Sequence, residues 1–504
     1  MQDWPRPARC NLVAKLLVAG FALLSLAWVF SNPPGAGPDE AANYIKAVAV
    51  GQGELLGVRG PLPAAQGAPF RPSAMRLAWS ASTTRWVRVP TRLSPAGFAH
   101  DGALSGRQPS YVGTYQPFMY LLPGLATRLA GDPVVALLLA RLVTALICLA
   151  LLATAAWLLA TPTRGGLALV GLLLAVTPLV VFLTSVVSAS GFEICAGICV
   201  FAAVLRIARS EPPPRPVFVA LTVAGIILAL SRPLGVIWLG LELALLLLLV
   251  GPDRLVRLIR TGGPASWLAA GSLLAAAGLG VGWELTIEPH HHTTMAELLY
   301  YLPRAIDLLP LDLKQAVGIF GWLDTWMPGG AYVLWVTALG LMLVGAIMLG
   351  TRRQRLILGL LTLATLGVAL GIGAAIIMPI GDAPLQARYF LAFAITVPLY
   401  AGEVIALNAG RLRWLKPAHL VGGFAALAAI IQAIALIANA TSFMGDLPDY
   451  ARVFTPAGRW TPPLGWIPWA AIGLAGCLLL LAAGATAFRS SRAAVPGRAR
   501  PIAA

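Results

Sequence analysis

The sequence predicts an all-helical membrane protein that crosses the bilayer many times. Of its 504 residues, 58% are hydrophobic and only 11% are charged, and the mean hydropathy is +0.81. Soluble globular proteins of this length are far less apolar. Apolar runs of about 20 residues recur along the whole chain, and a helix needs this length to cross a hydrocarbon core about 30 Å thick.

Each of these runs is expected to form one crossing, and the sequence contains about twelve of them. The first run follows Arg6 and Arg9 and is long for a signal peptide. No clear A-x-A cleavage site precedes the polar segment after it, so we expect a retained anchor. The expected crossings are residues 12–30, 133–160, 166–186, 190–207, 216–231, 233–250, 265–286, 331–350, 356–379, 386–408, 418–440 and 466–488.

Clusters of basic residues predict the orientation of the chain. If the N-terminus is cytoplasmic, twelve crossings place every cluster on the cytoplasmic side, as the positive-inside rule requires. Both termini are then cytoplasmic, in what we expect to be the inner membrane of a bacterium, and residues 489–504 form a basic tail. The net charge of +16 is explained by these loops and by contact with anionic membrane lipids, and no aromatic-basic module points to nucleic acid. The clusters read "RPAR", "RIARSEPPPR", "DRLVRLIR", "TRRQR", "RLRWLK" and "RSSRAAVPGRAR".

The longest polar segments fall on the outer side. The first covers residues 31–132 and contains two amphipathic stretches, "DEAANYIKAVAVGQGELLG" and "YQPFMYLLPGLATRLAG", which are expected to form helices in the interface plane. The second covers residues 287–330. We expect no appended soluble domain, so residues 1–504 are treated as a single membrane domain that works at its outer surface.

Two adjacent carboxylates, Asp39 and Glu40, follow the first crossing in "NPPGAGPDEAANY". Acids at this place contribute little to topology. One interpretation is a helix N-cap, since an acid at a first turn satisfies free amides and favours the helix dipole. The other is a general base that takes a proton from an attacking hydroxyl. The two roles are compatible.

An acidic pair in the first outer loop of a multi-spanning protein resembles the GT-C class of integral membrane glycosyltransferases, which use polyprenyl-phosphate-linked sugars. More narrowly, five stretches resemble, in order, the DUF2142 family of predicted bacterial membrane proteins. That family has a histidine shortly after the acidic pair, where this sequence has Asn43 and its neighbours. The stretches extend over roughly residues 30–400 and read "PPGAGPDEAANYIKA", "TPLVVFLTSVVSASGFEI", "SRPLGVIWL", "FGWLDTWMP" and "PLQARYFLAF".

The resemblance implies a GT-C-like fold and transfer of a sugar from a polyprenyl-phosphate donor to a cell-envelope glycan or lipid on the outer face. Asp39 is the expected base, and Glu40 would cap the next helix, orient the acceptor or help to bind a cation. A divalent cation, Mg²⁺ or Mn²⁺, would be held by Asp39 or Glu40. The sequence has no nucleotide-binding motif, which fits a donor that carries its own energy.

A leaving phosphate needs forked cationic groups near the outer interface. Arg388 and Arg232 lie at predicted outer helix ends, where the positive-inside rule disfavours them, and Arg141 is a third candidate. For Arg388 the alternatives are a snorkelling side chain or an ion pair with Asp382. For Arg232 they are a pair with Glu193 or a backbone carbonyl.

Asp324 lies between Trp322 and Trp326 in "FGWLDTWMP". Such tryptophans usually belong to the aromatic belt at the interface. Aromatic rings beside a carboxylate also stack on sugar faces. We therefore place Asp324, Trp322 and Asn43 with the sugar or acceptor contacts.

Two other classes of function are open: a transporter or flippase for lipid-linked glycans, and a non-catalytic scaffold of an envelope-assembly complex. A transporter would bury ionisable residues near the middle of the bilayer. The embedded acids here are Glu193, Glu242 and Glu403, while most acids lie outside the crossings. This distribution favours chemistry at the outer surface.

Overall fold

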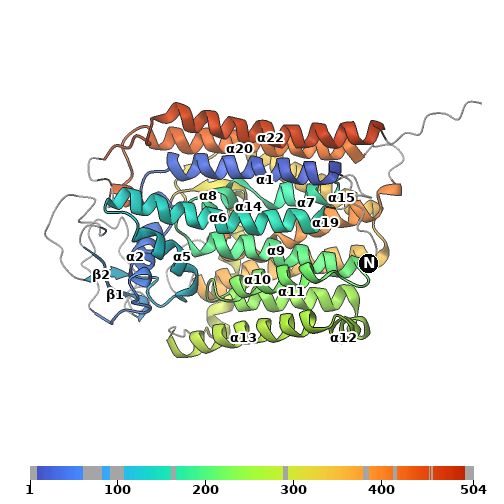
Figure 1. Ribbon diagram of the computed structural model, residues 1–504, viewed down its shortest axis with the longest axis horizontal. Coiled ribbons are helices and arrows are strands. Elements are labelled where there is room, and N and C mark those ends of the chain that lie inside the picture. The colour runs from blue at the N-terminus through green and yellow to red at the C-terminus, as the bar shows by residue number, and fades with distance from the viewer. Residues whose placement is uncertain are drawn as a thin grey trace, which may run out of the picture.

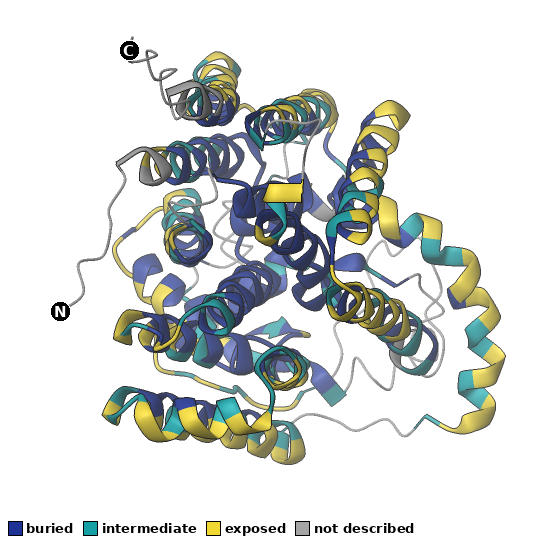
Figure 2. Ribbon diagram, turned by 90° about the vertical axis from the view of Figure 1, so that its right-hand side faces the viewer, coloured by how far each residue is buried: buried dark blue, intermediate teal, exposed yellow. Residues whose placement is uncertain are grey.

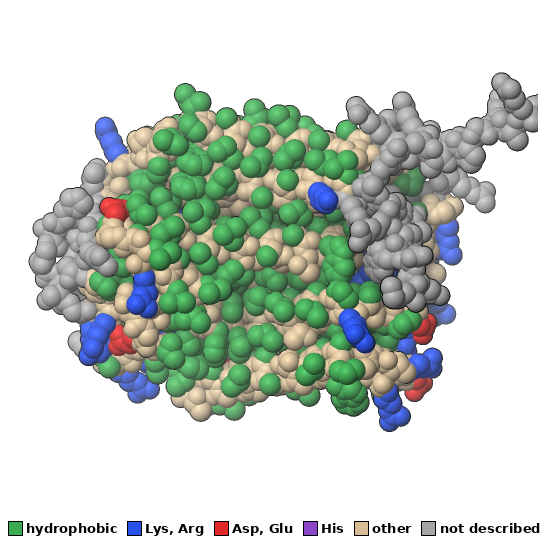
Figure 3. Space-filling model, viewed as in Figure 1, with side chains coloured by type: hydrophobic (Ala, Val, Ile, Leu, Met, Phe, Trp, Pro, Cys, Tyr) green, Lys and Arg blue, Asp and Glu red, His purple; other side chains and the backbone are tan. Residues whose placement is uncertain are grey.

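Long helices run side by side along one direction and make up the body of the protein (Figure 1). The computed structural model describes residues 8–60, 82–90, 93, 107–160, 166–287, 293–377, 385–411, 417–452, 455 and 458–493. The lateral surface is mostly apolar, and charged side chains gather toward the two ends of the helices (Figure 3). Leu268, Leu274 and Leu341 on this surface are 69%, 74% and 66% exposed. Such a surface belongs in lipid, so the predicted class, a multi-pass helical membrane protein, is confirmed.

Among the described residues, eight helices are long and apolar enough to cross a membrane, or nine if the bent pair α11 and α12 counts as one span. The sequence predicts about twelve crossings. The last helix runs on to Ala493, into the predicted basic tail. The eight are α1 (Ala8–Ser31), α6 (Pro133–Leu159), α9 (Ala189–Arg209), α13 (Pro264–Ile287), α15 (Gly329–Leu349), α16 (Arg352–Ile372), α20 (Pro417–Phe443) and α22 (Trp466–Ala493).

The other four predicted crossings are shorter or interrupted helices. Residues 166–186 are broken at Pro178, because proline lacks an N–H and cannot continue the preceding helix. Residues 386–408 begin with a 3₁₀ turn, and the helix after it runs only from Leu391 to Leu407, with an irregularity at Ile395. The elements are α7 (Ala168–Ala175), α8 (Pro178–Thr184), α10 (Arg215–Ala229), α11 (Gly235–Val250), η4 (Ala387–Tyr389), α18 (Leu391–Ala394) and α19 (Thr396–Leu407).

Helix α9 runs through the middle of the bundle (Figure 1), where the helices are buried while those at the periphery expose one side (Figure 2). In its most apolar stretch 89% of the residues are buried, against 28% for α13 and for α15. A glycine allows the close packing, because a Cβ on Gly197 would lie 2.6 Å from the carbonyl oxygen of Ala392. The polar residues at the start of α9 are therefore held rigidly, and they reach the site described below.

The first of the two predicted outer loops folds into a layer over one end of the helices, which we call the loop end (Figure 1). Helices α2 and α5 cross closely, since a Cβ on Gly51 would lie 2.2 Å from the carbonyl oxygen of Gly124. Strands β1 and β2 pair antiparallel beside them. The layer consists of α2 (Glu40–Gly51), β1 (Arg85–Arg88), β2 (Arg107–Ser110) and α5 (Phe118–Thr127).

Only one of the two amphipathic stretches has the exposed apolar side of an interfacial helix. Helix α5 exposes Phe118, Leu122 and Leu125. Helix α2 is buried along almost its whole length, contrary to the expectation of an interfacial helix. The reason is that its polar side chains find partners inside: the Lys46 ammonium donates to the carbonyls of Leu55 and Gly113, both at 2.6 Å.

The predicted second loop, residues 287–330, contains a long helix and a short hairpin. The helix begins with a capping box, in which Thr294 accepts from the Glu297 amide and Glu297 accepts from the Thr294 amide. Phe320 of the hairpin packs on Trp28 of α1, with ring centres 4.9 Å apart. The remaining elements are α12 (Pro252–Thr261), α14 (Met295–Gly318), β3 (Ile319–Phe320), β4 (Thr325–Trp326), η3 (Gly373–Ile377), η5 (Ala409–Arg411) and α21 (Asp449–Arg452).

Candidate functional site

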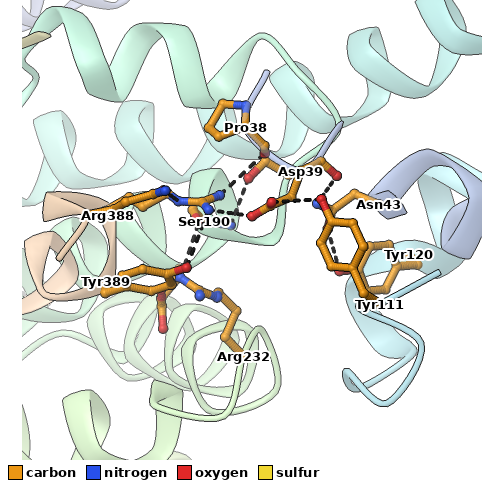
Figure 4. A network of polar contacts seen from close by, with 12 residues as sticks. Pro38, Asp39, Asn43, Tyr111, Tyr120, Ser190, Arg232, Arg388 and Tyr389 are labelled. Carbon is orange, nitrogen blue, oxygen red and sulfur yellow. Dashed lines mark hydrogen bonds and ion pairs between the residues drawn. The ribbon is translucent and has the colours of Figure 1, made fainter. Parts of the chain in front are cut away.

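Asp39 and Arg388 lie 349 residues apart in the chain and form an ion pair at the loop end (Figure 4). Arg388 also donates to the carbonyl of Pro38 at 3.3 Å and, through Nε, to Gln386 at 2.6 Å. The second oxygen of Asp39 accepts a hydrogen bond of 2.8 Å from the Tyr111 hydroxyl. The carboxylate is thus held from two sides, by η4 and by the turn after β2.

The carboxylate is the accessible part of this arrangement. The Asp39 side chain is 18% exposed and Tyr111 is 41% exposed, whereas the Arg388 side chain is 6% exposed. A molecule that approaches the loop end therefore meets Asp39 and Tyr111 first, with the guanidinium behind them.

The backbone at Asp39 is unusual, with φ 62° and ψ 10°. Residues other than glycine rarely adopt this left-handed conformation, although Asp and Asn tolerate it best. Asp39 occupies the N-cap position of α2, but its side chain makes no capping hydrogen bond. Asp39 thus lies where the helix-cap interpretation expects an acid, but its carboxylate does not cap the helix. The carboxylate is directed toward Arg388 and Tyr111 instead. Strained residues of this kind cluster at functional sites.

Tyr389 separates two arginines that would otherwise repel each other. Its ring centre lies 5.2 Å from the Arg388 guanidinium carbon and 4.7 Å from that of Arg232. The faces of an aromatic ring attract cations without cancelling their charge. Two positive groups are thereby collected in one small volume.

Arg232 forms the ion pair with Glu193 that was one of its predicted alternatives. Its Nη1 lies 3.2 Å from Glu193 Oε2 and donates to Ser190 at 3.1 Å. The indole of Trp238 donates to the other Glu193 oxygen at 3.1 Å. The Arg232 and Glu193 side chains are buried, so this pair forms the inner wall of the site.

Asp39 stays ionised in this environment. Burial raises its pKa. The charge of Arg388, the hydrogen bonds from Arg388 and Tyr111, and the charge of Arg232 together lower the pKa by more than burial raises it. The resulting pKa of Asp39 lies below the usual value for an aspartate. As long as Arg388 holds it, Asp39 is a carboxylate with little tendency to take up a proton.

Glu40, the neighbour of Asp39, is fully buried and holds the turn before α2. Arg141 donates to both of its oxygens, from Nε at 2.7 Å and from Nη2 at 2.6 Å. The amides of Gly35 and Val187 donate to the same carboxylate at 3.0 Å each. Arg141 has no donor left for a phosphate, because its other N–H groups bind the carbonyls of Val29, Asn32 and Pro33.

Asn43 lies one helical turn after Asp39 and binds its backbone. Its amide donates to the backbone carbonyl of Asp39 at 2.7 Å, and its oxygen accepts from the Tyr120 hydroxyl at 2.6 Å. At 3% exposure, Asn43 positions the turn and does not present a free group to a ligand.

Comparison with known proteins places this chain in a family. The family model described as a predicted membrane protein (DUF2142) matches residues 21–397. The chain belongs to the DUF2142 family. No curated protein and no solved structure matches it. The matched segment contains both partners of the Asp39–Arg388 pair.

In this DUF2142 chain, Asp324 and Trp322 lie on a different support from Asp39. Their hairpin packs against α8, α14 and α20. Asp324 is exposed and accepts from the amide of Trp322 at 3.2 Å, and Trp322 is 41% exposed. Both side chains are exposed, and they belong to the hairpin and not to α2.

Two tyrosines of the site in this chain were not predicted from the sequence. Tyr389 follows Arg388 directly in "QARYF", and Tyr111 follows β2. A tyrosine beside an unexpected outer arginine is a usable signal, since a ring can stack on a guanidinium. Tyr111 carried no such signal, because its contact with Asp39 spans 72 residues.

Among the described residues, no group of three or more His, Cys, Asp and Glu is placed to hold a metal ion. The predicted pair Asp39 and Glu40 cannot bind one metal ion together, because the Glu40 carboxylate is paired with Arg141 in the interior. Of the two, only Asp39 is accessible to Mg²⁺ or Mn²⁺. Asp382, the other predicted partner of Arg388, lies outside the described residues.

An apolar cavity of about 440 Å³ begins next to the site. Phe390 and Leu391, which follow Tyr389 directly, form part of its wall. The rest comes mainly from α7, α14, α15, α16 and α19, with side chains such as Leu174, Trp335 and Leu366. A charged site and a mostly apolar cavity, whose lining also includes Asp312, are thus joined through consecutive residues.

Proposed function

We propose that this DUF2142 protein is a glycosyltransferase of the GT-C type, which transfers a sugar from a polyprenyl-phosphate donor to a cell-envelope acceptor. The observation that carries the proposal is the Asp39–Arg388 pair, which joins an accessible carboxylate to two clustered arginines beside an apolar cavity. A lipid-linked sugar phosphate has the three matching parts: a sugar, an anionic phosphate and a long apolar chain.

In this proposal the arginines bind the donor phosphate. Arg388 has a weak bond to Pro38, at 3.3 Å, that a phosphate oxygen could replace, and Arg232 adds charge from behind Tyr389. Forked guanidinium groups match phosphate geometry and stabilise the negative charge that gathers as the phosphate leaves. The isoprenoid chain would enter the cavity that begins at Phe390.

Donor binding would also activate the base. A phosphate that draws Arg388 away from Asp39 removes the main group that lowers the pKa of this carboxylate. Asp39 then takes the proton of the acceptor hydroxyl, while the hydroxyl oxygen bonds to the anomeric carbon and the bond from that carbon to the phosphate oxygen breaks. The products are the glycosylated acceptor and polyprenyl phosphate.

The same proposal includes twelve crossings and a loop end that faces away from the cytoplasm, in the inner membrane of a bacterium. Helix α11 supports this number of crossings. Arg232, three residues before its first residue, lies in the site, and the carbonyls of Leu248 and Leu249 in its last turn accept hydrogen bonds from Arg353. A helix of 16 residues is therefore long enough to run between the two ends. The basic clusters at the end opposite the loop end agree with a cytoplasmic side.

We expect a reporter fused after Arg355 to be cytoplasmic and one fused after Pro310 to be external. The physical reason is the charge difference between the "TRRQR" turn and the loop end. Enzyme reporters that are active on only one side of the membrane measure both fusions. The opposite result at both positions would put the proposed site in the cytoplasm and rule out an outer-face reaction.

The function itself is tested by transfer in membranes. Membranes that contain the wild-type protein should release polyprenyl phosphate from labelled polyprenyl-phosphate sugars and move the label to an envelope acceptor. Membranes with the Asp39→Asn variant, at matched protein level, should not. Equal release from both membranes would contradict the proposal.

The embedded acids give the transporter alternative little support. Glu193 is paired with Arg232, and Glu403 lies 3.0 Å from Arg209 in a second buried pair. Both carboxylate oxygens of Glu242 are buried without a hydrogen-bond partner among the described residues, and so is Oδ1 of Asp312 on α14. A transport pathway needs a series of ionisable groups along the bilayer, and two such acids on separate helices do not make one.

A further inference from the structure

Helix α12 lies across the end of the bundle that is opposite the loop end. It follows α11 after a bend of 102° at Gly251, whose φ of 80° suits glycine. Its apolar side chains and its arginines point to different sides of the helix, as in helices that lie in a membrane interface. The location of α12 is therefore the level of the lipid headgroups.

The apolar side of α12 closes a second cavity, of about 430 Å³. Leu255, Leu258 and Ile259 contribute from α12, and α10, α11 and α13 supply the other walls. Ser266 is the one polar side chain in the described lining, and its hydroxyl is already bonded to the carbonyls of Ile259 and Gly263. The cavity therefore suits a hydrocarbon chain and offers nothing to a polar molecule.

This cavity opens sideways, toward lipid. Gly240 of α11 and Leu274 of α13 line it and are both exposed on the lateral surface. A Cβ on Gly240 would meet no atom within 4 Å. The gap between α11 and α13 is thus unfilled by the described chain.

The side of α12 that faces away from the cavity is strongly basic. Arg257 and Arg260 are exposed and make no ion pair with the described residues. Arg254 binds the carbonyls of Ala208 and Ser210, which fixes the helix to the end of α9. Figure 3 shows basic side chains at this end of the molecule. An apolar cavity therefore lies beneath two arginines that have no ion-pair partner among the described residues, although Asp253 lies on the same helix.

We propose that α12 and this cavity form a binding site for an anionic phospholipid, distinct from the proposed donor site. One acyl chain occupies the cavity between α10, α11 and α13, and the headgroup phosphate lies beside Arg257 and Arg260. Hydrocarbon fills a space that no side chain fills, and the anionic headgroup supplies the missing counter-charge. A zwitterionic lipid satisfies only the first of these two requirements.

Native mass spectrometry of the purified protein tests this, with phosphatidylglycerol and phosphatidylcholine of equal chain length as probes. The wild-type protein should retain one phosphatidylglycerol molecule in preference to phosphatidylcholine. The double variant Arg257→Gln/Arg260→Gln should bind that lipid roughly 5- to 25-fold more weakly, since a basic residue near the membrane surface is worth about fivefold. Gly240→Leu should fill the cavity and remove the bound lipid while all arginines remain.

A matched control uses Arg352→Gln/Arg355→Gln, a second pair of exposed arginines three residues apart at the same end. This variant should retain the bound lipid. Equal loss in both double variants would show general surface attraction and overturn the proposal. So would an unchanged lipid in Gly240→Leu, equal binding of phosphatidylcholine, or a protein dimer that Gly240→Leu dissociates.

Discussion

Asp39→Asn is expected to lower the rate of sugar transfer by about 10² to 10⁴-fold, while the protein stays folded and loses less stability than Glu40→Gln does, because the Asp39 side chain is 18% exposed and Glu40 is fully buried. Asparagine keeps the shape of the side chain and tolerates the left-handed backbone at this position. It cannot take the proton of the acceptor hydroxyl. Binding of the donor lipid should be retained or become tighter, because Arg388 no longer has Asp39 as a competing partner.

Asp132→Asn is the matched control for that variant. Asp132 also occupies a helix N-cap, but its carboxylate does cap, accepting from the Val135 amide at 2.9 Å. Asparagine caps a helix as well as aspartate does, so neither transfer nor stability should change. If Asp39→Asn behaved like Asp132→Asn, Asp39 would be a structural residue and not the base.

Glu40→Gln is expected to destabilise the fold by about 3–5 kcal/mol, although the chemical change is as small as the one at Asp39. The neutral amide leaves the Arg141 guanidinium buried without a counter-charge. Glutamine also has only one acceptor oxygen, so it cannot replace both of the carboxylate oxygens that accept hydrogen bonds from the amides of Gly35 and Val187. Thermal unfolding in detergent, measured beside the wild-type protein, checks this expectation.

Two comparisons show whether the buried pair is the cause. Glu54→Gln removes a carboxylate of the same loop whose ion pair with Arg107 is partly exposed, at 22% and 31%, so it should cost less than about 1 kcal/mol. The double variant Glu40→Gln/Arg141→Met should be less destabilised than the sum of its single changes. A stable Glu40→Gln protein would mean that this turn does not depend on the pair.

The different roles of Asp39 and Glu40 could not be predicted from the sequence. The two acids are adjacent and chemically similar, and their roles depend on partners that are 349 and 101 residues away. The sequence does identify Arg388 and Arg232, because each opposes the positive-inside rule at a predicted outer helix end. The same argument also selected Arg141, which the fold uses up on Glu40 and on three backbone carbonyls.

The helical membrane class follows from the apolar composition together with the recurring apolar runs of about 20 residues, which is the length that a helix needs to cross a bilayer. The lengths of the helices do not follow, because an average of hydropathy passes smoothly over a local break such as Pro178. The burial of α2 was also unpredictable. Its alternation of small apolar and polar residues fits an interfacial helix until Lys46 and Asn43 find internal partners.

The most direct test of the proposed site is the binding of polyprenyl phosphate compared with polyprenol, which has the same chain and no phosphate. We expect the wild-type protein to bind the phosphate form at least about tenfold more tightly, since hydrogen bonds to charged groups contribute about 1.5–3 kcal/mol. Arg388→Gln should abolish this difference without loss of folded protein, and Arg355→Gln, at the opposite end, should preserve it. Equal binding of the two lipids by the wild-type protein, or a preference that survives in Arg388→Gln, would contradict the account.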